Sequence, residues 1–163
     1  MFRVGDRVVY PMHGAGVIEA IEEREILGEA TQVYVMRMPV GDMQVMIPVE
    51  SSETVGLRRV MDREQWEEVR EILSQADAEE NQNWNRRYRE NAERLKSGDL
   101  RQVAAVVRDL LRRDREKGLS TGERRMLDNA LQILVSEVAL ALDLELEEAE
   151  ARIEAAVPAR KSA

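Results

Sequence analysis

The sequence predicts an α+β protein of two domains, with an N-terminal sheet followed by an all-helical part. Several short β-prone segments follow one another within the first fifty residues, which is typical of a small, strongly bent barrel or antiparallel sheet. From Asp62 onward the apolar residues recur with a helical period, and about five helices fit in the remaining chain. A length of 163 residues with 44% hydrophobic residues is enough for one ordinary domain or two small ones.

Four segments of the N-terminal part have the composition of strands. The one over residues 33–38 is the strongest, because β-branched and aromatic residues stand together there. Turn signals at Gly28 and Gly41 separate these segments, and a glycine-rich loop over 13–16 follows the first. A small sheet of this kind leaves at least one edge strand able to accept a strand from a partner. The predicted strands are 6–10, 17–21, 33–38 and 43–47.

Capping signals divide the helical part. Asp62 and Gln65 have the form of a capping box, and so do Asp99 and Gln102. Ser120 is placed to cap a fourth helix. The polar stretch 74–83 has no clear period and is predicted to be a hinge or short linker, and the tail 159–163 is expected to fray. The predicted helices are 62–73, 84–96, 99–117, 120–138 and about 144–157, in a domain of residues 56–163 that follows a domain of residues 1–55.

The residue inventory argues against an enzyme. Without cysteine there is no disulfide, thiol nucleophile or cysteine-ligated metal, and a single histidine, His13, excludes a histidine-pair metal site. His13 lies in a glycine-rich loop with no acidic partner near it in sequence, so we expect a structural or exposed side chain. We predict no catalytic residue, no metal and no cofactor. The chain has no apolar run of the ~18 residues that span a membrane and no secretory signal, so we expect a cytoplasmic protein without membrane contact.

A basic island stands within an acidic chain. The net charge is -8, yet residues 84–125 hold 13 basic and 7 acidic residues, a net charge of +6. Arginine supplies 21 of the 24 basic residues of the chain. Its planar fork suits phosphate, but a compositional bias toward arginine would give the same count. The island indicates a nucleic-acid partner that the acidic net charge of the whole chain would hide.

The segment that begins at Trp84 combines two aromatic residues with three arginines at the start of a predicted helix. Arginines can hold backbone phosphates while an aromatic ring stacks on bases or wedges between them. Two further arginine groups accompany it on the next two predicted helices. These are Arg101, Arg108, Arg112 and Arg115 opposite the apolar face of the third helix, and Arg124 and Arg125 at the start of the fourth.

A purely structural interpretation of the same residues stays open. Trp84, Tyr88, Ala92 and Leu95 recur with the spacing of a buried stripe, so periodicity alone favours a buried Trp84. The first helical turn, however, is the loosest place to bury a ring. The arginines could equally form a solvated face, paired with Glu90, Glu93 and Asp109. The other tryptophan, Trp66, is predicted to pack in the core.

Several motifs in one order resemble the CarD/CdnL family of bacterial transcription factors. The first is the run from Val4 to Gly14, Val-Gly-Asp-Arg-Val-Val-Tyr-Pro-Met-His-Gly. The second is Trp-Asn-Arg-Arg-Tyr over 84–88, and the third extends from Val106 through Gly118-Leu119-Ser120 to Leu127. Residues 1 to about 55 also resemble the polymerase-interacting module of the transcription-repair coupling factor, whose helicase would not fit in this chain.

The resemblance implies a Tudor-like N-terminal domain that docks on the β-subunit lobe of RNA polymerase holoenzyme. It also implies a helical domain that meets promoter DNA, largely without sequence preference, at the upstream edge of the melted bubble. There the family tryptophan, which matches Trp84, wedges into the minor groove and stabilises the open complex. The family also implies a monomer that reaches the nucleoid through the polymerase. The predicted DNA-contacting residues are Trp84, Arg86, Arg87, Arg89 and Arg124, and the predicted polymerase-contacting residues are Arg24 and Met46.

One position departs from the family pattern, and two other functions remain as alternatives. Relatives can carry arginine where this chain has Met46, so an ionic contact is lost there and only an apolar one is left. The main alternative is a protein–protein adaptor that holds RNA polymerase without touching DNA, with Trp84 buried. An RNA-binding module is the other.

Overall fold

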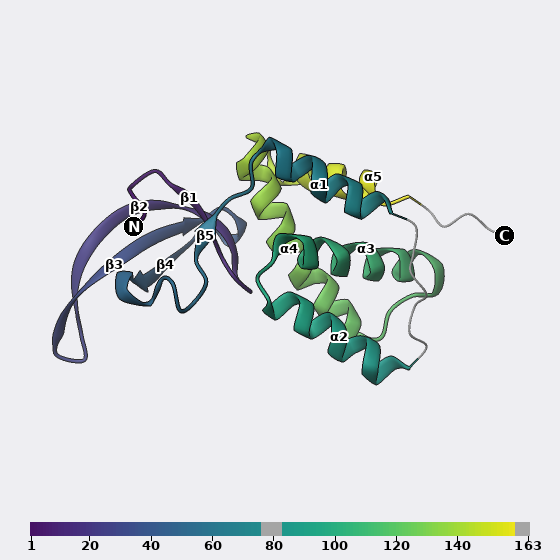
Figure 1. The fold of residues 1–163 in the computed structure, drawn as a ribbon, viewed down its shortest axis with the longest axis horizontal. Coiled ribbons are helices and arrows are strands. Elements are labelled where there is room, and N and C mark those ends of the chain that lie inside the picture. Colours follow the sequence, from purple (N-terminus) through teal and green to yellow (C-terminus); the bar gives the residue numbers. More distant parts are fainter. Residues whose placement is uncertain (76–82, 159–163) are drawn as a thin grey trace.

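The structure is a computed structural model that describes residues 1–75 and 83–158. A sheet forms one end of the molecule and a group of helices forms the other, as the α+β prediction requires (Figure 1). Most of the predicted hinge at 74–83 lies outside the described residues, and so does the tail 159–163.

The sheet is five-stranded and antiparallel, in the order β4-β3-β2-β1-β5. The four predicted strands are confirmed, but the second is much longer than predicted and begins inside the predicted glycine-rich loop. The last, short strand was missed, and it lies beyond the predicted domain boundary at residue 55. The bounds are β1 (Arg7–Tyr10), β2 (Gly14–Ile26), β3 (Glu29–Met38), β4 (Met43–Pro48) and β5 (Arg58–Arg59).

Close packing explains why the glycine-rich segment is a strand. A Cβ on Gly16 would lie 2.5 Å from the carbonyl oxygen of Arg37 on β3, so only glycine lets the two strands approach this closely. One face of the sheet carries its own apolar core, which includes Ile18, Tyr34 and Met36. Strands β4 and β5 are the two edges of the sheet, and among the described residues β4 pairs only with β3.

The described residues contain five α-helices, close to the predicted spans. Asp62 and Gln65 form the predicted capping box, whereas Asp99 caps its helix by accepting from the backbone N–H of Arg101, so its predicted box with Gln102 does not form. Ser120 accepts from the backbone N–H of Glu123, as predicted. The helices are α1 (Arg63–Ser74), α2 (Trp84–Lys96), α3 (Leu100–Lys117), α4 (Thr121–Leu142) and α5 (Leu146–Ala156).

The helices enclose a second apolar core. The predicted stripe of α3, from Val103 to Leu111, is buried, and Trp66 is 6% exposed within the same cluster, which confirms its predicted packing role. Helix α4 is the longest and passes from beside α2 to the sheet (Figure 1).

Polar contacts fix the sheet against α4. The Ser136 hydroxyl accepts from the backbone N–H of Ala15 on β2 at 2.9 Å. The Glu137 carboxylate, only 1% exposed, accepts two bonds of 2.8 Å from the Arg58 guanidinium and one of 2.8 Å from the backbone N–H of Met61. Arg7 on β1 donates to the carbonyl of Leu140 near the end of α4. The two parts of the molecule are therefore held in one orientation.

We predict that Glu137→Ala lowers the free energy of unfolding by about 2–4 kcal/mol, because it leaves a partly buried guanidinium and a buried N–H without their acceptor. Urea denaturation monitored by circular dichroism measures this. The exposed Glu150 on α5 provides the control, since its replacement by alanine should cost less than about 0.5 kcal/mol. Equal losses for the two variants would show that the Glu137 contacts contribute no more than a surface residue.

Candidate nucleic-acid interface

Trp84 lies at the first position of α2 with its indole partly in solvent. The preceding Asn83 caps the helix by accepting from the backbone N–H of Arg86 at 3.1 Å. Trp84 is 42% exposed, so the buried position that periodicity predicts for it is wrong. The i, i+4 pattern failed here because the first turn of α2 extends past the core that covers Leu95.

The exposed indole is nevertheless held in place. Its Nε1–H donates to the Ser120 hydroxyl at 3.0 Å and to the Glu123 carboxylate at 3.1 Å. Its ring stacks on Tyr88 of the next helical turn, with centroids 5.1 Å apart and planes 17° from parallel. A large apolar ring is thus fixed at the surface by contacts to its edge and to one face.

Glu123 is the buried acceptor at the centre of this arrangement. It is 1% exposed, and it also accepts from the Arg87 guanidinium at 3.0 and 3.3 Å. Burial raises the pKa of the Glu123 carboxyl, but the hydrogen bonds and charge of Arg87 and the charge of Arg113 outweigh it, so the pKa lies below its ordinary value. The carboxylate is therefore ionised at neutral pH.

Arg87 does not lie on the surface with the other predicted DNA-contacting residues. It is 7% exposed and its side chain points into the protein toward Glu123. A phosphate contact would require this buried pair to open, which is costly. The structure thus gives Arg87 a role beneath Trp84, in place of the surface position expected from its neighbours in sequence.

Arg86, Arg89 and Arg124 do lie at the surface. Arg86 and Arg89 border a shallow groove on the outer face of α2, and Arg86 pairs with Glu90 at 3.4 Å. Arg124 follows the Ser120 cap and pairs with Asp114, whose hydrogen bond raises the pKa of Arg124 above its ordinary value. Exposed pairs of this kind are weak, so these guanidinium groups can exchange their partners for phosphate.

The arginine stripe predicted on α3 has a different use. Arg108 donates to the carbonyl of Ile72, and Arg115 donates to the carbonyls of Glu154 and Val157. These acceptors are at the C-terminal ends of α1 and α5, where cations are favourable, and the carbonyls of Ile72 and Glu154 also accept from the backbone N–H groups of Gln75 and Val157. Arg101 pairs with Glu68 at 2.8 Å. The stripe therefore connects helices, and its interpretation as a phosphate-binding face is not supported.

The two predicted polymerase-contacting residues share one face of the sheet. Arg24 is opposite Thr31 and Met46 is opposite Val35, and alternate residues of β3 point to the same side. The Met46 residue is 44% exposed, and the Arg24 side chain is 48% exposed and pairs with Glu22 at 2.6 Å. Residues far apart in sequence thus form one surface with apolar and charged parts.

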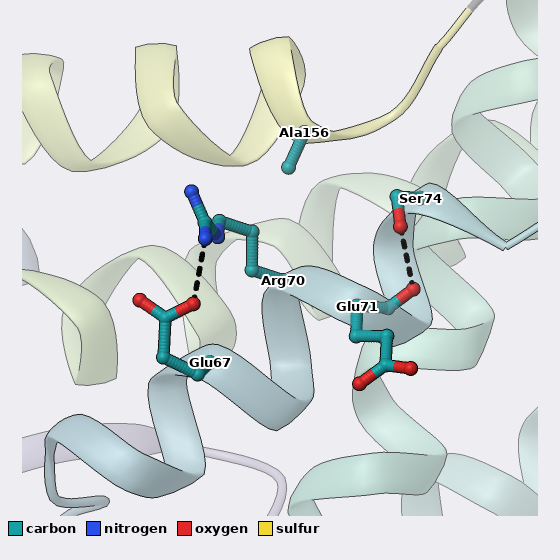
Figure 2. A pocket seen from close by; sticks show the side chains of 5 residues that line it. All are labelled: Glu67, Arg70, Glu71, Ser74 and Ala156. Atoms are coloured by element: carbon teal, nitrogen blue, oxygen red, sulfur yellow. Dashed lines mark hydrogen bonds and ion pairs between the residues drawn. The ribbon is translucent and has the colours of Figure 1, made fainter.

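Other hollows offer less chemistry. The pocket between α1 and α5 is bordered by Arg70, which pairs with Glu67, and by Ser74, which donates to the carbonyl of Glu71 (Figure 2). His13 is exposed and its ring lies against that of Tyr10. Across residues 1–75 and 83–158 no three histidine or acidic side chains are grouped as metal ligands would be. No helix in the same ranges has the length and apolar character to cross a membrane.

The supporting residues Ser120 and Glu123 were missed as part of the site. Their capping spacing was visible in the sequence and predicted a helix start, with nothing to indicate that the carboxylate would bind an indole 39 residues earlier in the chain. Only the tertiary fold shows that Glu123, in the first turn of α4, is buried.

Two family models match the chain, one to each part. The model described as the CarD-like/TRCF RID domain matches residues 2–61, and that described as the CarD C-terminal domain matches residues 68–154. The chain is also 44% identical over 138 residues to the putative transcription factor YdeB of Bacillus subtilis, which covers 85% of this chain and 90% of the relative. The chain belongs to the CarD family. In this CarD-family chain the sheet lies within the first match, and Trp84 and its supports lie within the second.

Proposed function

We propose that this CarD-family protein is a transcription regulator that binds the β-subunit lobe of RNA polymerase through its sheet. Its helical part then places Trp84 in the minor groove at the upstream edge of the bubble and stabilises the open promoter complex. The observation that carries the proposal is an exposed indole that Ser120, Glu123 and Tyr88 hold at the surface. Exposed arginines accompany it on the same helices, Arg86 and Arg89 on α2 and Arg124 on α4.

The energies are compatible with this mechanism. Opening a base step costs about a few kcal/mol, and stacking on an aromatic side chain returns roughly 1–3 kcal/mol. A binding protein shifts an equilibrium only by its differential affinity for the two states, so an indole that fits only distorted DNA favours the open complex. A preference of about 1.4 kcal/mol changes the ratio of open to closed complex tenfold.

Docking to polymerase compensates for weak binding to DNA. With a net charge of -8 the free protein is repelled by DNA, and its phosphate contacts are few. Because the Arg58–Glu137 contacts hold sheet and helices in one orientation, binding at the sheet brings Trp84 to a fixed position relative to the polymerase. Phosphate contacts position the helical part without reading sequence.

The alternative is an adaptor that holds polymerase without touching DNA. The edge strand β4 and the surface shared by Arg24 and Met46 serve equally well in that function. The pairs Arg86–Glu90 and Arg124–Asp114 would then be a solvated surface. The tests below separate the two functions.

Trp84→Ala should shorten the lifetime of the open complex by about fivefold or more, while binding to polymerase is unchanged. The lifetime is measured by challenging preformed holoenzyme–promoter complexes with a competitor. Trp66→Phe replaces the other tryptophan, which is buried away from the surface, and should keep the wild-type lifetime. A wild-type lifetime for Trp84→Ala would eliminate the wedge and favour the adaptor.

Arg24→Glu should weaken binding to an isolated β-lobe fragment by roughly tenfold, because it reverses the one charge predicted to contact the polymerase. Calorimetric titration gives the affinity. Arg70→Glu makes the same charge change on α1, with a similarly exposed side chain, and should bind as the wild type does. Equal affinity of the two variants would place the polymerase contact elsewhere.

The double variant Arg86→Glu and Arg89→Glu should weaken the promoter effect and reduce its dependence on salt. Each lost phosphate contact lowers the salt slope by about 0.9. The variant Arg63→Glu and Arg70→Glu carries the same net charge on α1 and should keep the wild-type slope. If both double variants have the same slope, the α2 arginines make no phosphate contact.

A further inference from the structure

We propose that Glu123 is a positioning residue for Trp84: its buried carboxylate fixes the indole in the orientation that is offered to DNA. This inference rests on the proposed function of Trp84 and assigns a role to a residue that faces the protein interior and does not touch the nucleic acid.

The first argument is the cost of placing a charge at this position. Glu123 is 1% exposed and ionised, and a buried carboxylate is expensive unless its hydrogen-bonding capacity is used. Three side chains donate hydrogen bonds to this carboxylate, two from α2 and one from the cap of its own helix. Arg87 donates at 3.0 Å, Trp84 at 3.1 Å and Ser120 at 3.3 Å. An apolar side chain could pack at this position without the free-energy cost of burying a charge. The carboxylate is therefore present for the hydrogen bonds that it accepts.

The second argument is geometric. Oxygen Oε1 accepts from the Trp84 Nε1–H, and oxygen Oε2 accepts from the Arg87 Nε–H. Trp84 and Arg87 are three positions apart on α2, so a single carboxylate of α4 holds two neighbouring side chains of the first helical turn. Glu123 thereby couples the direction of the indole to the position of the first turn of α2.

The third argument concerns what remains of the indole for a ligand. The Nε1–H is already shared between Ser120 and Glu123, and one ring face is covered by Tyr88. What is left is one apolar face and the outer ring edge. The ring can therefore stack on a single base or separate a base step, and it has no donor with which to select a base.

An unheld indole would bind less well because binding would have to immobilise it. Freezing a side chain costs on the order of 0.5–1.5 kcal/mol in binding, which corresponds to roughly a two- to tenfold change in affinity. We therefore expect Glu123→Gln, which keeps the shape but loses the charge, to shorten the open-complex lifetime by roughly two- to tenfold. Polymerase binding should not change.

A double-mutant cycle with the full-length protein and holoenzyme tests the role. If Glu123 acts through the indole, Glu123→Gln shortens the lifetime in the wild type and has no further effect in Trp84→Ala. Trp84→Phe has no N–H for Glu123 to hold, so it should have an intermediate lifetime that Glu123→Gln does not lower further. Equal shortening by Glu123→Gln with and without Trp84 would overturn the inference.

A second measurement reports on the indole directly and does not depend on DNA. With Trp66→Phe as background, Trp84 is the single tryptophan, and Glu123→Gln should make its emission more accessible to acrylamide. If Glu123→Gln alone folds poorly, the double variant Arg87→Gln and Glu123→Gln replaces it, because it removes both charges of the buried pair. Val106→Ala, a variant in the core of α3, controls for lost stability and should leave quenching unchanged.

The outcomes separate the inference from the proposed function. If Trp84→Ala leaves the lifetime unchanged but Glu123→Gln increases quenching, the wedge fails and the positioning of the indole stands. If Trp84→Ala shortens the lifetime and Glu123→Gln changes neither lifetime nor quenching, the wedge stands and Glu123 is only a structural residue.

Discussion

Two buried carboxylates on one helix determine the arrangement of this protein. Near the start of α4, Glu123 binds Arg87 and the indole of Trp84, and near its end Glu137 binds Arg58 and the backbone of Met61. A buried carboxylate without its partners would lower the stability of the fold, so the stable fold requires these partners to lie where they do. The helix that carries them forms much of the apolar core as well. Sheet, core and exposed ring are thus connected through a single rigid element.

The abundance of arginine is explained in large part by internal contacts. Arg7, Arg108 and Arg115 donate to carbonyls at the C-terminal ends of three different helices, where the helix dipole favours a cation. The planar fork of arginine suits this, since it can reach two acceptors at once. A net charge of +6 over residues 84–125 therefore overstates the cationic surface available to a nucleic acid. The remaining candidates are the exposed guanidinium groups of Arg86 and Arg89 on α2 and of Arg124 on α4.

Much of the fold could be predicted from local signals, and the site could be predicted only in part. Capping residues such as Asp62 and Ser120 and the apolar stripe of α3 gave helix limits close to those observed. Strand β5 was missed because two residues carry no periodicity, and it depends on pairing with β1. The burial of Arg87 and the exposure of Trp84 both ran against local pattern. Arg87 is buried because it pairs with the carboxylate of Glu123, which approaches from another helix, and periodicity within α2 holds no information about that carboxylate. Trp84 is exposed because the first turn of α2 extends past the helical core.

The motif that resembles the CarD family identified Trp84 where periodicity favoured the opposite. The same motif placed Arg87 among surface residues, although its side chain turns inward. A sequence motif preserves the set of residues that work together without distinguishing those that touch a ligand from those that support them. Separating the two requires distances and burial, as the contrast between Arg86 and Arg87 illustrates.

The length of α4 between its two glutamates imposes a constraint on how such a chain can change over evolution. Glu123 and Glu137 are separated by nearly four helical turns, about 21 Å along the axis, and so project from nearly the same side. Inserting or deleting one residue between them would rotate one carboxylate by about 100° relative to the other and leave it facing the wrong neighbours. Substitutions can accumulate along this helix, but its residue count between the two acids should be invariant among functional relatives.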